Sequence, residues 1–350
     1  MKISVIIPCR NEKRHIREFL DSALAQELEP DWELEILVAD GMSGDGTREE
    51  LRDYAERSAV VRLIDNPGRI VSTGLNAAIG ASTGDVIVRM DVHTTYAPDY
   101  IRQCVTVLRE TGADNVGGPW VAQGRGCVGK AIAAAFQSRF CAGGGKAHDP
   151  GYEGAVDTVY LGCWRRTVFE RAGLFDTGLV RNQDDEFNFR LRRMGGRIWQ
   201  SPRIQSVYVP RACIRELFRQ YLQYGFWKVA VIRKHGALAS WRHAAPVLFV
   251  TWIGLSLVLL AVADALRLPA LAGAVGAVLA AGLSIYTLAC AAAALEFSRR
   301  LPLLSLAILP AVMAIYHVAY GLGFLLGILK SSGKREREPA KEGLFTVLTR

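Results

Sequence analysis

The stretch of sequence that decides the fold is Asp85-Val86-Ile87-Val88-Arg89-Met90-Asp91-Val92-His93, an apolar run that ends in polar residues. Similar apolar runs occupy residues 3–9, 34–40 and 60–65. Uninterrupted runs of this kind are typical of parallel strands that are buried on both faces of a sheet. Helical patterns separate them, so we expect residues 1–210 to form an α/β domain with a largely parallel sheet.

Two of the helical patterns follow a strand directly. Ile16, Phe19 and Leu20, continued by Ala23 and Leu24, recur at the spacing of one helix face. Thr47 and Glu50 have the spacing of a capping box, in which each side chain bonds the other residue's backbone at the start of a helix.

The composition allows about two domains, because 350 residues exceed the roughly 150 of an ordinary domain. Half of the residues are hydrophobic and 22% are charged, which excludes a disordered chain and indicates a charged globular part beside a more apolar one. The seven cysteines never occur as Cys-x-x-Cys, so neither a disulfide framework nor a structural zinc site is indicated.

The apolar part lies at the C-terminal end. Three runs, which begin at Ala244, Leu268 and Leu301, continue without Asp, Glu, Lys or Arg for at least the roughly 20 residues that cross a bilayer. We therefore expect a membrane domain over 244–330, followed by a polar tail over 331–350. Its hydrophobic segments are expected at 244–266, 268–295 and 301–329.

Basic residues indicate the orientation of these segments, because cytoplasmic flanks carry the excess of Lys and Arg. A basic cluster at 233–243 precedes the first segment, and the N-terminus shows no signal-peptide pattern. Residues 1–240 are thus expected in the cytoplasm, as the catalytic part of a multi-pass protein of the cytoplasmic (inner) membrane. Three crossings would place Lys330 and the basic tail outside, against the same rule. The sequence leaves open whether the third segment, which contains Pro302 and Pro310, is bent or does not cross.

Polar residues follow the predicted strands, at the edge where an open parallel sheet binds its ligands. These strand ends match neither the GxGxxG fingerprint nor a P-loop. Asp91 and His93 lie two residues apart, and their side chains share one face if the strand continues that far. They are a candidate two-ligand site for magnesium or manganese, whose remaining ligands are usually water and phosphate oxygens. A polar strand end that His93 caps is the alternative.

Four motifs, in this order, carry a resemblance to a known family. They are Ile6–Glu12, Asp40–Thr47, Asp85–His93 and Gln183–Leu191. Together they resemble glycosyltransferase family 2, and the Asp-x-His pair with Arg-Asn-Gln-Asp-Asp-Glu at 181–186 resembles the succinoglycan-type exopolysaccharide glucosyltransferases. The resemblance implies a GT-A fold, which is a Rossmann-like nucleotide-diphospho-sugar transferase domain, followed by an interfacial helix and C-terminal transmembrane helices.

The resemblance also implies roles for the matched residues. Asp184 matches the catalytic base, with Asp185 and Glu186 as support, although three acids also suit the positive end of a helix dipole. Asp91 and His93 match the metal-binding motif, which implies Mn2+ or Mg2+. The residues expected to bind the nucleotide sugar are Pro8, Arg10, Asn11, Glu12, Asp40, Ser43, Asp45, Arg69, Asn76, Arg89 and Asp91.

Residues 211–243 are expected to form an amphipathic helix region at the membrane interface. Within it, Gln223–Trp227 resembles the QxxRW motif of processive synthases, with Phe226 in place of the Arg and Lys228 as the nearest charge. The glycine-rich segment 143–157 suits either acceptor contact or a plain surface loop. The acceptor or diphosphate candidates are Asp157, Trp164, Gln223, Trp227 and Lys228.

The leading hypothesis is a membrane-anchored inverting glycosyltransferase that moves a hexose, with glucose favoured, from a UDP-sugar to a polyprenyl-diphosphate-linked saccharide of an exopolysaccharide or cell-surface glycan. The alternatives are a polyprenyl-phosphate sugar synthase, a processive polysaccharide synthase and a non-catalytic membrane scaffold. No nucleic-acid partner is expected, because the basic residues gather at the membrane boundary instead of forming a stripe with aromatic residues. The oligomeric state is left open.

Overall fold

The structure is a computed structural model that describes residues 1–237, 241–331 and 345. Apart from Ser331 and Phe345, the predicted polar tail lies outside the described residues.

The chain divides into two compact units. The first combines Met1–Val121 with Gly145–Val209, and the second combines Ala122–Gly144 with Pro210–Arg350. An internal stretch of about twenty residues therefore groups with the C-terminal part of the chain, which the order of the sequence does not reveal.

The first unit is built on one mixed sheet in the order β3-β2-β1-β4-β9-β6-β10-β8. The first four strands along the chain pair with one another in parallel, as the apolar runs predict. The strand β9 runs antiparallel to both β4 and β6, so the sheet is less parallel than expected. The strands are β1 (Lys2–Cys9), β2 (Glu33–Asp40), β3 (Val61–Asp65), β4 (Val86–Arg89), β6 (Asn115–Gly118), β8 (Gly154–Ala155), β9 (Tyr160–Arg165) and β10 (Ile198–Gln200).

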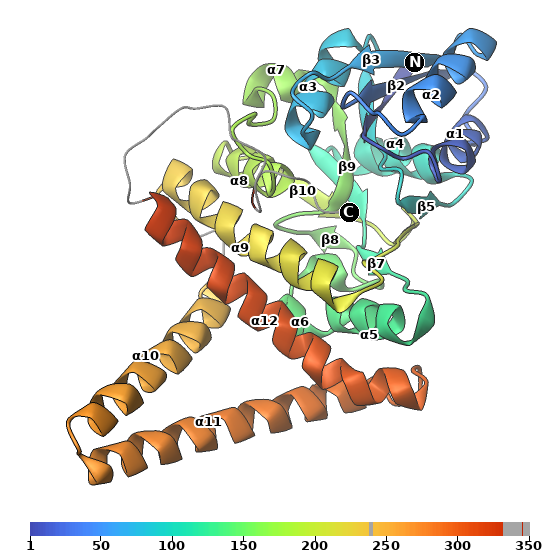
Figure 1. The fold of residues 1–350 in the computed structure, drawn as a ribbon. Helices are drawn as coiled ribbons and strands as arrows, with labels where there is room; N and C mark the ends of the chain where they lie inside the picture. Colours follow the sequence, from blue (N-terminus) through green and yellow to red (C-terminus); the bar gives the residue numbers. More distant parts are fainter. Residues whose placement is uncertain (238–240, 332–344, 346–350) are drawn as a thin grey trace. The chain divides into compact units, whose positions relative to one another are not determined.

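Helices cover both faces of this sheet (Figure 1). Alternate residues of β1 enter two hydrophobic clusters, because successive side chains of a strand point to opposite faces. Ile3, Val5 and Ile7 pack with α1, α2 and α4, whereas Ile6 packs with α3, α7 and α8. The helices are α1 (Ile16–Leu24), α2 (Thr47–Arg57), α3 (Val71–Ala81), α4 (Tyr100–Thr111), α7 (Arg166–Ala172) and α8 (Gln183–Arg193), with a 3-10 turn at Lys146–His148. A small second sheet has the order β5 (Thr94–Tyr96), β11 (Ser206–Tyr208), β7 (Val121–Ala122).

The helix α2 begins at Thr47 as predicted, but the capping box does not form. The Thr47 hydroxyl oxygen instead accepts the backbone N–H of Glu12 at 2.7 Å, and the hydroxyl donates to Asp45. A contact with the loop after β1 therefore replaces the local cap.

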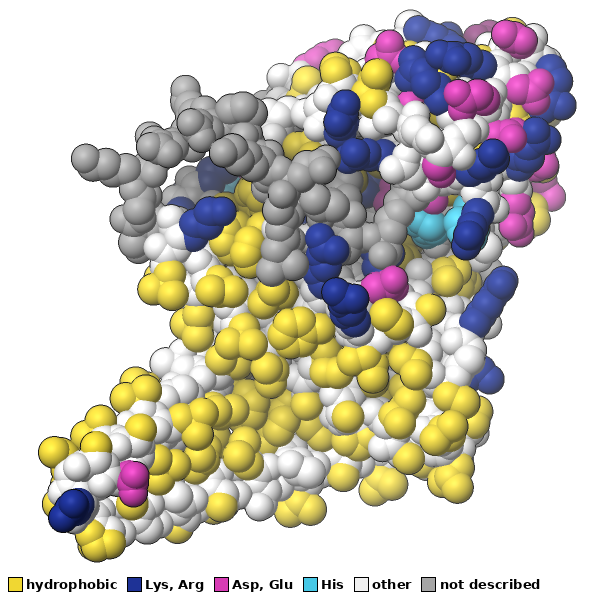
Figure 2. All heavy atoms as spheres, viewed as in Figure 1, with side chains coloured by type: hydrophobic (Ala, Val, Ile, Leu, Met, Phe, Trp, Pro, Cys, Tyr) yellow, Lys and Arg dark blue, Asp and Glu magenta, His cyan; other side chains and the backbone are white. Residues whose placement is uncertain are grey.

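The second unit is helical. Its elements are α5 (Gly126–Gln137), α6 (Arg139–Ala142), α9 (Ile214–His235), a 3-10 turn at Trp241–His243, α10 (Ala245–Ala265), α11 (Pro269–Leu295) and α12 (Leu303–Ser331). By length and composition, α10, α11 and α12 are each apolar enough to cross a membrane. Figure 2 shows hydrophobic side chains over most of the visible face of α10 and α11.

Candidate active site

The loops after β1 and β2 are joined into one surface at the C-terminal edge of the sheet. The backbone N–H of Asn11 donates to Ser43 Oγ at 2.8 Å, and the N–H of Gly44 returns a bond to Asn11 Oδ1 at 3.1 Å. The N–H of Lys13 donates to Asp45 Oδ2 at 3.2 Å. Three of the residues predicted to bind the nucleotide sugar therefore lie side by side in one hydrogen-bonded pair of loops.

The carboxylate of Asp40 lies beneath this surface and is fully buried. It accepts the N–H and the hydroxyl of Ser43, and Arg48 Nη1 lies 2.9 Å from Asp40 Oδ2. The same guanidinium also pairs with Asp65. Asp40 thus holds the loop in place, and Arg48, which no sequence motif indicates, supplies its counter-charge.

Asp45 has a similar task at the start of α2. Its carboxylate accepts both the hydroxyl and the backbone N–H of Thr47. Burial acts to raise the pKa of Asp45, but these hydrogen bonds and that from Lys13 outweigh it, and the net effect lowers the pKa. The side chain is therefore an ionised acceptor that closes the loop.

Two residues at the β1 end line the same edge. Pro8 is the penultimate residue of β1 and pairs in register with Ala39 of β2. The Arg10 side chain runs over Gly41, where an added Cβ would lie 3.1 Å from Arg10 Cβ. A larger residue at position 41 would displace this arginine.

Arg69 and Asn76 belong to the segment between β3 and the middle of α3. Arg69 is exposed and has a positive φ of 59°. The amide of Asn76 instead bonds the backbone of Phe175 twice, donating at 2.8 Å and accepting at 3.0 Å. This pairing joins α3 to the segment before α8, and the predicted nucleotide contact of Asn76 stays a prediction.

Arg89, at the end of β4, forms the central ion pair of the site. Its Nε and Nη2 donate to the two carboxylate oxygens of Asp91 at 2.9 and 2.8 Å, and only 7% of the Arg89 side chain is exposed. The backbone of Asp91 is fixed as well, because its N–H donates to Tyr96 Oη at 2.6 Å and that hydroxyl donates to the Asp91 carbonyl. Tyr96 carries no motif signal, so sequence reasoning missed it.

His93 follows on a turn, because β4 ends at Arg89 and does not continue to position 93. His93 Nε2 lies 2.9 Å from Glu12 Oε1, whereas the Asp91 carboxylate faces Arg89. The two candidate ligands thus have different partners. In the part of the chain that the structure describes, no group of three His, Cys, Asp or Glu side chains could hold a metal ion.

The donors that are present fit a metal that takes two protein ligands and completes its shell from a substrate. Asp91 and His93 offer one carboxylate and one imidazole, and 30% and 37% of their side chains are exposed. His93 Nε2 is a buried ring nitrogen whose nearest acid is Glu12, at 2.9 Å. Manganese accepts this mixture of oxygen and nitrogen donors.

Asp184 lies in the first turn of α8 and acts on the same guanidinium. Burial lowers the pKa of Arg89, but the neighbouring charge of Asp91, and less strongly that of Asp184, raises it well above its usual range. The Asp184 side chain is half-buried and accepts the backbone N–H of Asp185, which is also half-buried. The charges of the candidate base and of the candidate metal ligand therefore both act on one buried cation.

Glu186 is placed differently from the other two acids. It is fully buried, and Arg190 donates to both of its carboxylate oxygens at 3.1 and 3.0 Å. Arg190 also donates to the carbonyl oxygens of Ala172 and Leu174. Glu186 therefore fixes α8 against the preceding segment, and its support of Asp184 stays a prediction.

Of the acceptor candidates in the first unit, Trp164 has a core position. Only 2% of it is exposed, and its ring packs edge-on against Phe169 and Phe187 at centroid distances of 5.5 and 6.1 Å. This burial is at odds with the predicted contact to an acceptor. Asp157 is half-buried and precedes Thr158, whose hydroxyl accepts a bond from Asn188 of α8.

The other acceptor candidates lie on α9 in the second unit. Gln223 and Lys228 are buried and Trp227 is half-buried. Their predicted contact with acceptor or diphosphate stays a prediction.

The chain is similar to known glycosyltransferases. The model of the family described as Glycosyl transferase family 2 matches residues 4–174. The chain is 35% identical to the succinoglycan biosynthesis protein ExoA of Rhizobium meliloti, over 69% of this chain and 74% of that protein. It is 26% identical to a dolichyl N-acetyl-alpha-D-glucosaminyl phosphate 3-beta-D-2,3-diacetamido-2,3-dideoxy-beta-D-glucuronosyltransferase of Methanococcus voltae, over 66% of this chain and 74% of that protein.

A solved structure shares the fold. It is the mannosyltransferase PcManGT from Pyrobaculum calidifontis in complex with GDP-Man and Mn2+, with a TM-score of 0.56, 20% identity and coverage of 94% of this chain and 87% of that one. The predicted GT-A fold, with three apolar C-terminal helices that could span a membrane, is therefore confirmed. On the family match and the similarity to the succinoglycan protein, the chain belongs to glycosyl transferase family 2.

Proposed function

We propose that this glycosyltransferase is inverting and moves a hexose, with glucose favoured, from a UDP-sugar to a polyprenyl-diphosphate-linked saccharide. The observation that carries the proposal is the buried ion pair of Arg89 with Asp91 at the C-terminal edge of the sheet, where the charge of Asp184 also acts on Arg89. Open α/β sheets bind their ligands at this edge. In our proposal Asp91 belongs to the site of the donor diphosphate, and Asp184 acts on the acceptor.

The reaction needs a group that removes a proton from the acceptor. In our proposal the Asp184 carboxylate takes the proton of the acceptor hydroxyl while its oxygen attacks the anomeric carbon. The new glycosidic bond forms as the bond to the diphosphate breaks, and the diphosphate leaves with the electron pair. Arg89, held by Asp91, keeps a positive charge beside this group.

Asp91 and His93 would hold Mn2+ or Mg2+. When bound, such an ion neutralises negative charge that develops on the leaving diphosphate. The solved mannosyltransferase of the same fold contains Mn2+. The Asn11–Ser43 and Lys13–Asp45 loop pairs would form the nucleotide side of the site.

The names of relatives support a lipid-linked acceptor. The Methanococcus voltae protein is named for a dolichyl-linked sugar phosphate, and the Rhizobium meliloti protein for succinoglycan biosynthesis. GDP-Man in the solved structure makes GDP-sugars a necessary part of any donor test. We place residues 1–210 as the catalytic domain on the cytoplasmic side of the inner membrane, anchored by 244–330.

The test is transfer of labelled sugar into membrane lipid extract from UDP-glucose, UDP-galactose and GDP-mannose, with Mn2+, Mg2+ or EDTA. We expect label from one UDP-hexose, loss of label with EDTA, and a fall of at least about a hundredfold in Asp184→Asn, the lower end of what a positioned base contributes. Glu170→Gln is the matched control, because Glu170 is an exposed acid on α7 of the same unit.

Other outcomes separate the alternatives. A polyprenyl-phosphate sugar synthase needs no hydroxyl deprotonation, so full activity of Asp184→Asn on lipid phosphate would support it and refute our assignment. A ladder of products would indicate a processive synthase. Label from GDP-mannose alone would overturn the proposed donor while leaving the site intact.

A further inference from the structure

The third apolar helix, α12, differs from α10 and α11 in how much protein covers it. Within its most apolar stretch 39% of the residues are buried, against 11% in α10 and 17% in α11. The buried residues recur at intervals of three and four, which marks one helix face. They are Ser305, Leu309, Val312, Met313, Tyr316 and Ala319.

The second half of α12 packs backbone to backbone against α9. A Cβ added at Gly323 would lie 2.0 Å from the carbonyl oxygen of Leu222, and one added at Gly327 would lie 2.8 Å from that of Phe226. Only glycine permits such an approach. Because positions increase together along both helices, α9 and α12 run parallel here, as Figure 1 also shows.

The helix α9 has the length of a membrane span but not its composition. It is 22 residues long and is absent from the candidate spans of the described chain. Charged side chains at a bilayer centre are costly. Its charged residues are Arg215, Glu216, Arg219, Lys228, Arg233 and Lys234. We therefore expect α9 to lie outside the hydrocarbon core of the bilayer. The part of α12 that packs against α9 then lies at the same depth.

The helices α10 and α11 form an antiparallel hairpin. Contacts between them show which residues of the two helices lie at the same height along it. The Phe249 ring stacks on Tyr286 at 4.3 Å, and farther along, a Cβ at Gly276 would lie 3.9 Å from Leu260. Phe249 is in the second turn of α10, so Tyr286 lies near the end of the hairpin at which α10 begins, away from the turn between α10 and α11.

The middle of α12 contacts both helices of the hairpin near this level. His317 Nδ1 lies 2.8 Å from Tyr286 Oη of α11, and a Cβ at Gly321 would meet the carbonyl oxygen of Pro246 at 2.5 Å, in the first turn of α10. Four residues along α12, about 6 Å, separate these two contacts. Tyr320 faces His243, which precedes α10, at a ring distance of 6.5 Å. In Figure 1, α12 runs across the direction of α10.

We infer that α12 lies along the membrane surface beside α9, within one leaflet, and that only α10 and α11 cross the bilayer. The exposed side of α12 suits this place, since Leu322, Leu326 and Leu329 are apolar and Lys330 follows them. A helix that lies in the interface buries its apolar face among acyl chains and keeps its charges at the headgroups. Two crossings also remove the conflict with the positive-inside rule, because Lys330 then lies on the same side as the basic end of α9.

The experiment determines sidedness in the full chain, with one tag at each terminus. Right-side-out and inverted membrane vesicles are treated with a protease and probed for both tags. We expect both tags to survive in right-side-out vesicles and both to be lost in inverted ones. Loss of the C-terminal tag alone in right-side-out vesicles would show that α12 crosses, and would overturn the inference.

The hairpin is tested in the same vesicles by Leu266→Cys and a membrane-impermeant maleimide. Leu266 lies between α10 and α11 and is 63% exposed. The wild type is the control, because its exposed cysteines, Cys127 and Cys213, lie outside the hairpin. We expect the variant alone to be labelled in right-side-out vesicles. Labelling of the variant's added cysteine only in inverted vesicles would mean that the hairpin does not cross, which also contradicts the inference. Neither readout depends on activity, so the proposed function can fail without affecting it.

Discussion

Among single residues, Arg89 is the one that joins the candidate site together. It is a buried cation that two acids offset, Asp91 through two direct bonds and Asp184 through its charge. Burying a charge is costly unless it is paired and hydrogen-bonded. The bidentate geometry meets this requirement and fixes the orientation of the Asp91 carboxylate toward Arg89.

Replacement of Arg89 by Met should remove this orientation and leave Asp91 without its counter-charge. Breaking a buried ion pair costs about 3 kcal/mol, so the melting temperature of the purified protein should fall by several degrees. Nucleotide affinity should fall with it. Arg57→Met is the control, since Arg57 and Asp53 form an exposed pair on α2. Equal melting temperatures for the two variants would show that the Arg89–Asp91 pair stabilises the fold no more than the exposed Arg57–Asp53 pair.

Some residue-scale assignments follow from the sequence and others could not. The strand ends correctly indicate that Asn11, Ser43 and Asp45 lie together. The bonds of Asn76 to Phe175, 99 positions away, and the burial of Trp164 depend on tertiary packing that local patterns do not encode. Tyr96 and Arg48 were missed for the same reason, because their partners are fixed by the turn after β4 and by the convergence of β2 and β3.

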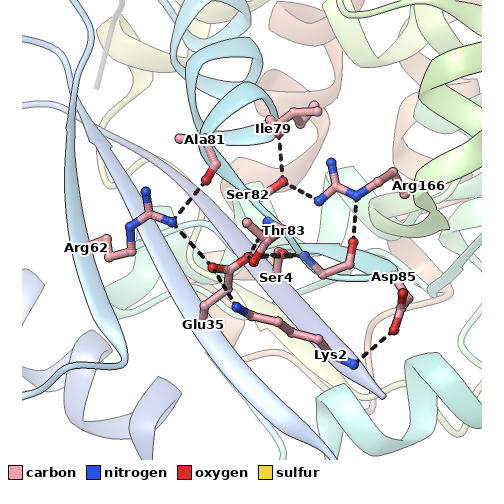
Figure 3. Close-up of polar contacts among 11 residues, drawn as sticks. Lys2, Ser4, Glu35, Arg62, Ile79, Ala81, Ser82, Thr83, Asp85 and Arg166 are labelled. Carbon is pink, nitrogen blue, oxygen red and sulfur yellow. Dashed lines mark hydrogen bonds and ion pairs between the residues drawn. The ribbon is translucent and has the colours of Figure 1, made fainter.

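At the element scale, a second polar network joins β1, β2 and the turn after α3 at the opposite end of these strands (Figure 3). Glu35 accepts bonds from the Ser4 hydroxyl and from the Thr83 backbone and hydroxyl, and it pairs with Lys2 and Arg62. Burial would raise the pKa of Glu35, but these contacts outweigh it and lower the pKa to about 2.

The pH dependence of stability should reveal this network. Because the folded-state pKa is lowered from 4.5, the contribution of Glu35 is complete above about pH 4.5 and is lost as the pH falls toward 2. A change of that size corresponds to roughly 3 kcal/mol. In Glu35→Gln, the loss of stability between these pH values should be smaller than in the wild type, as followed by denaturant melts. Glu33→Gln, an exposed acid on the same strand, should behave like the wild type. Parallel curves for wild type and Glu35→Gln would refute the assignment.

The contact of α9 with α12 makes a separate prediction. Gly323→Ala places a methyl group against the Leu222 carbonyl and should separate the two helices, whereas Gly254→Ala on α10 meets nothing within 4 Å. In thermal melts in detergent we expect a lower melting temperature for Gly323→Ala than for the wild type. Gly254→Ala should melt at the same temperature as the wild type. A tolerated Gly323→Ala would contradict the close packing.

The elements themselves were largely predictable. Apolar runs located β1 to β4, the helical spacing located α1 and α9, and long uncharged runs located α10 to α12. The prediction of a capping box was wrong because the Thr47 hydroxyl accepts a hydrogen bond from the Glu12 backbone instead. The antiparallel strand β9 was not foreseen, since a strand's sequence does not carry its direction.

At the scale of the whole molecule, the two units do not follow the order of the sequence. The helix α5 belongs to the second unit and buries Ala131, Ile132 and Phe136, and the carbonyl of Ile132 accepts a bond from Tyr316 of α12. No local pattern in residues 122–144 predicts the contact with α12, because that contact joins residues 184 positions apart.

A fragment of residues 1–209 should therefore expose the apolar face of α5 and aggregate, although it contains the predicted catalytic domain. The same fragment with Ile132→Ser and Phe136→Ser should be more soluble, because large exposed apolar patches promote association. The soluble fraction after centrifugation is the measurement. A wild-type fragment that stays fully soluble would show that α5 does not need to be covered by the C-terminal helices of its unit.

In the proposed mechanism Asp91 belongs to the donor site and Asp184 to the chemistry. The most direct test compares nucleotide binding with sugar transfer in Asp91→Asn and Asp184→Asn, using calorimetric titration of UDP with Mn2+ beside the transfer assay. The account predicts that Asp184→Asn binds UDP within about threefold of the wild type and loses at least about a hundredfold in transfer, whereas Asp91→Asn loses both. Unimpaired transfer by Asp184→Asn, or loss of UDP binding in that variant, would contradict it.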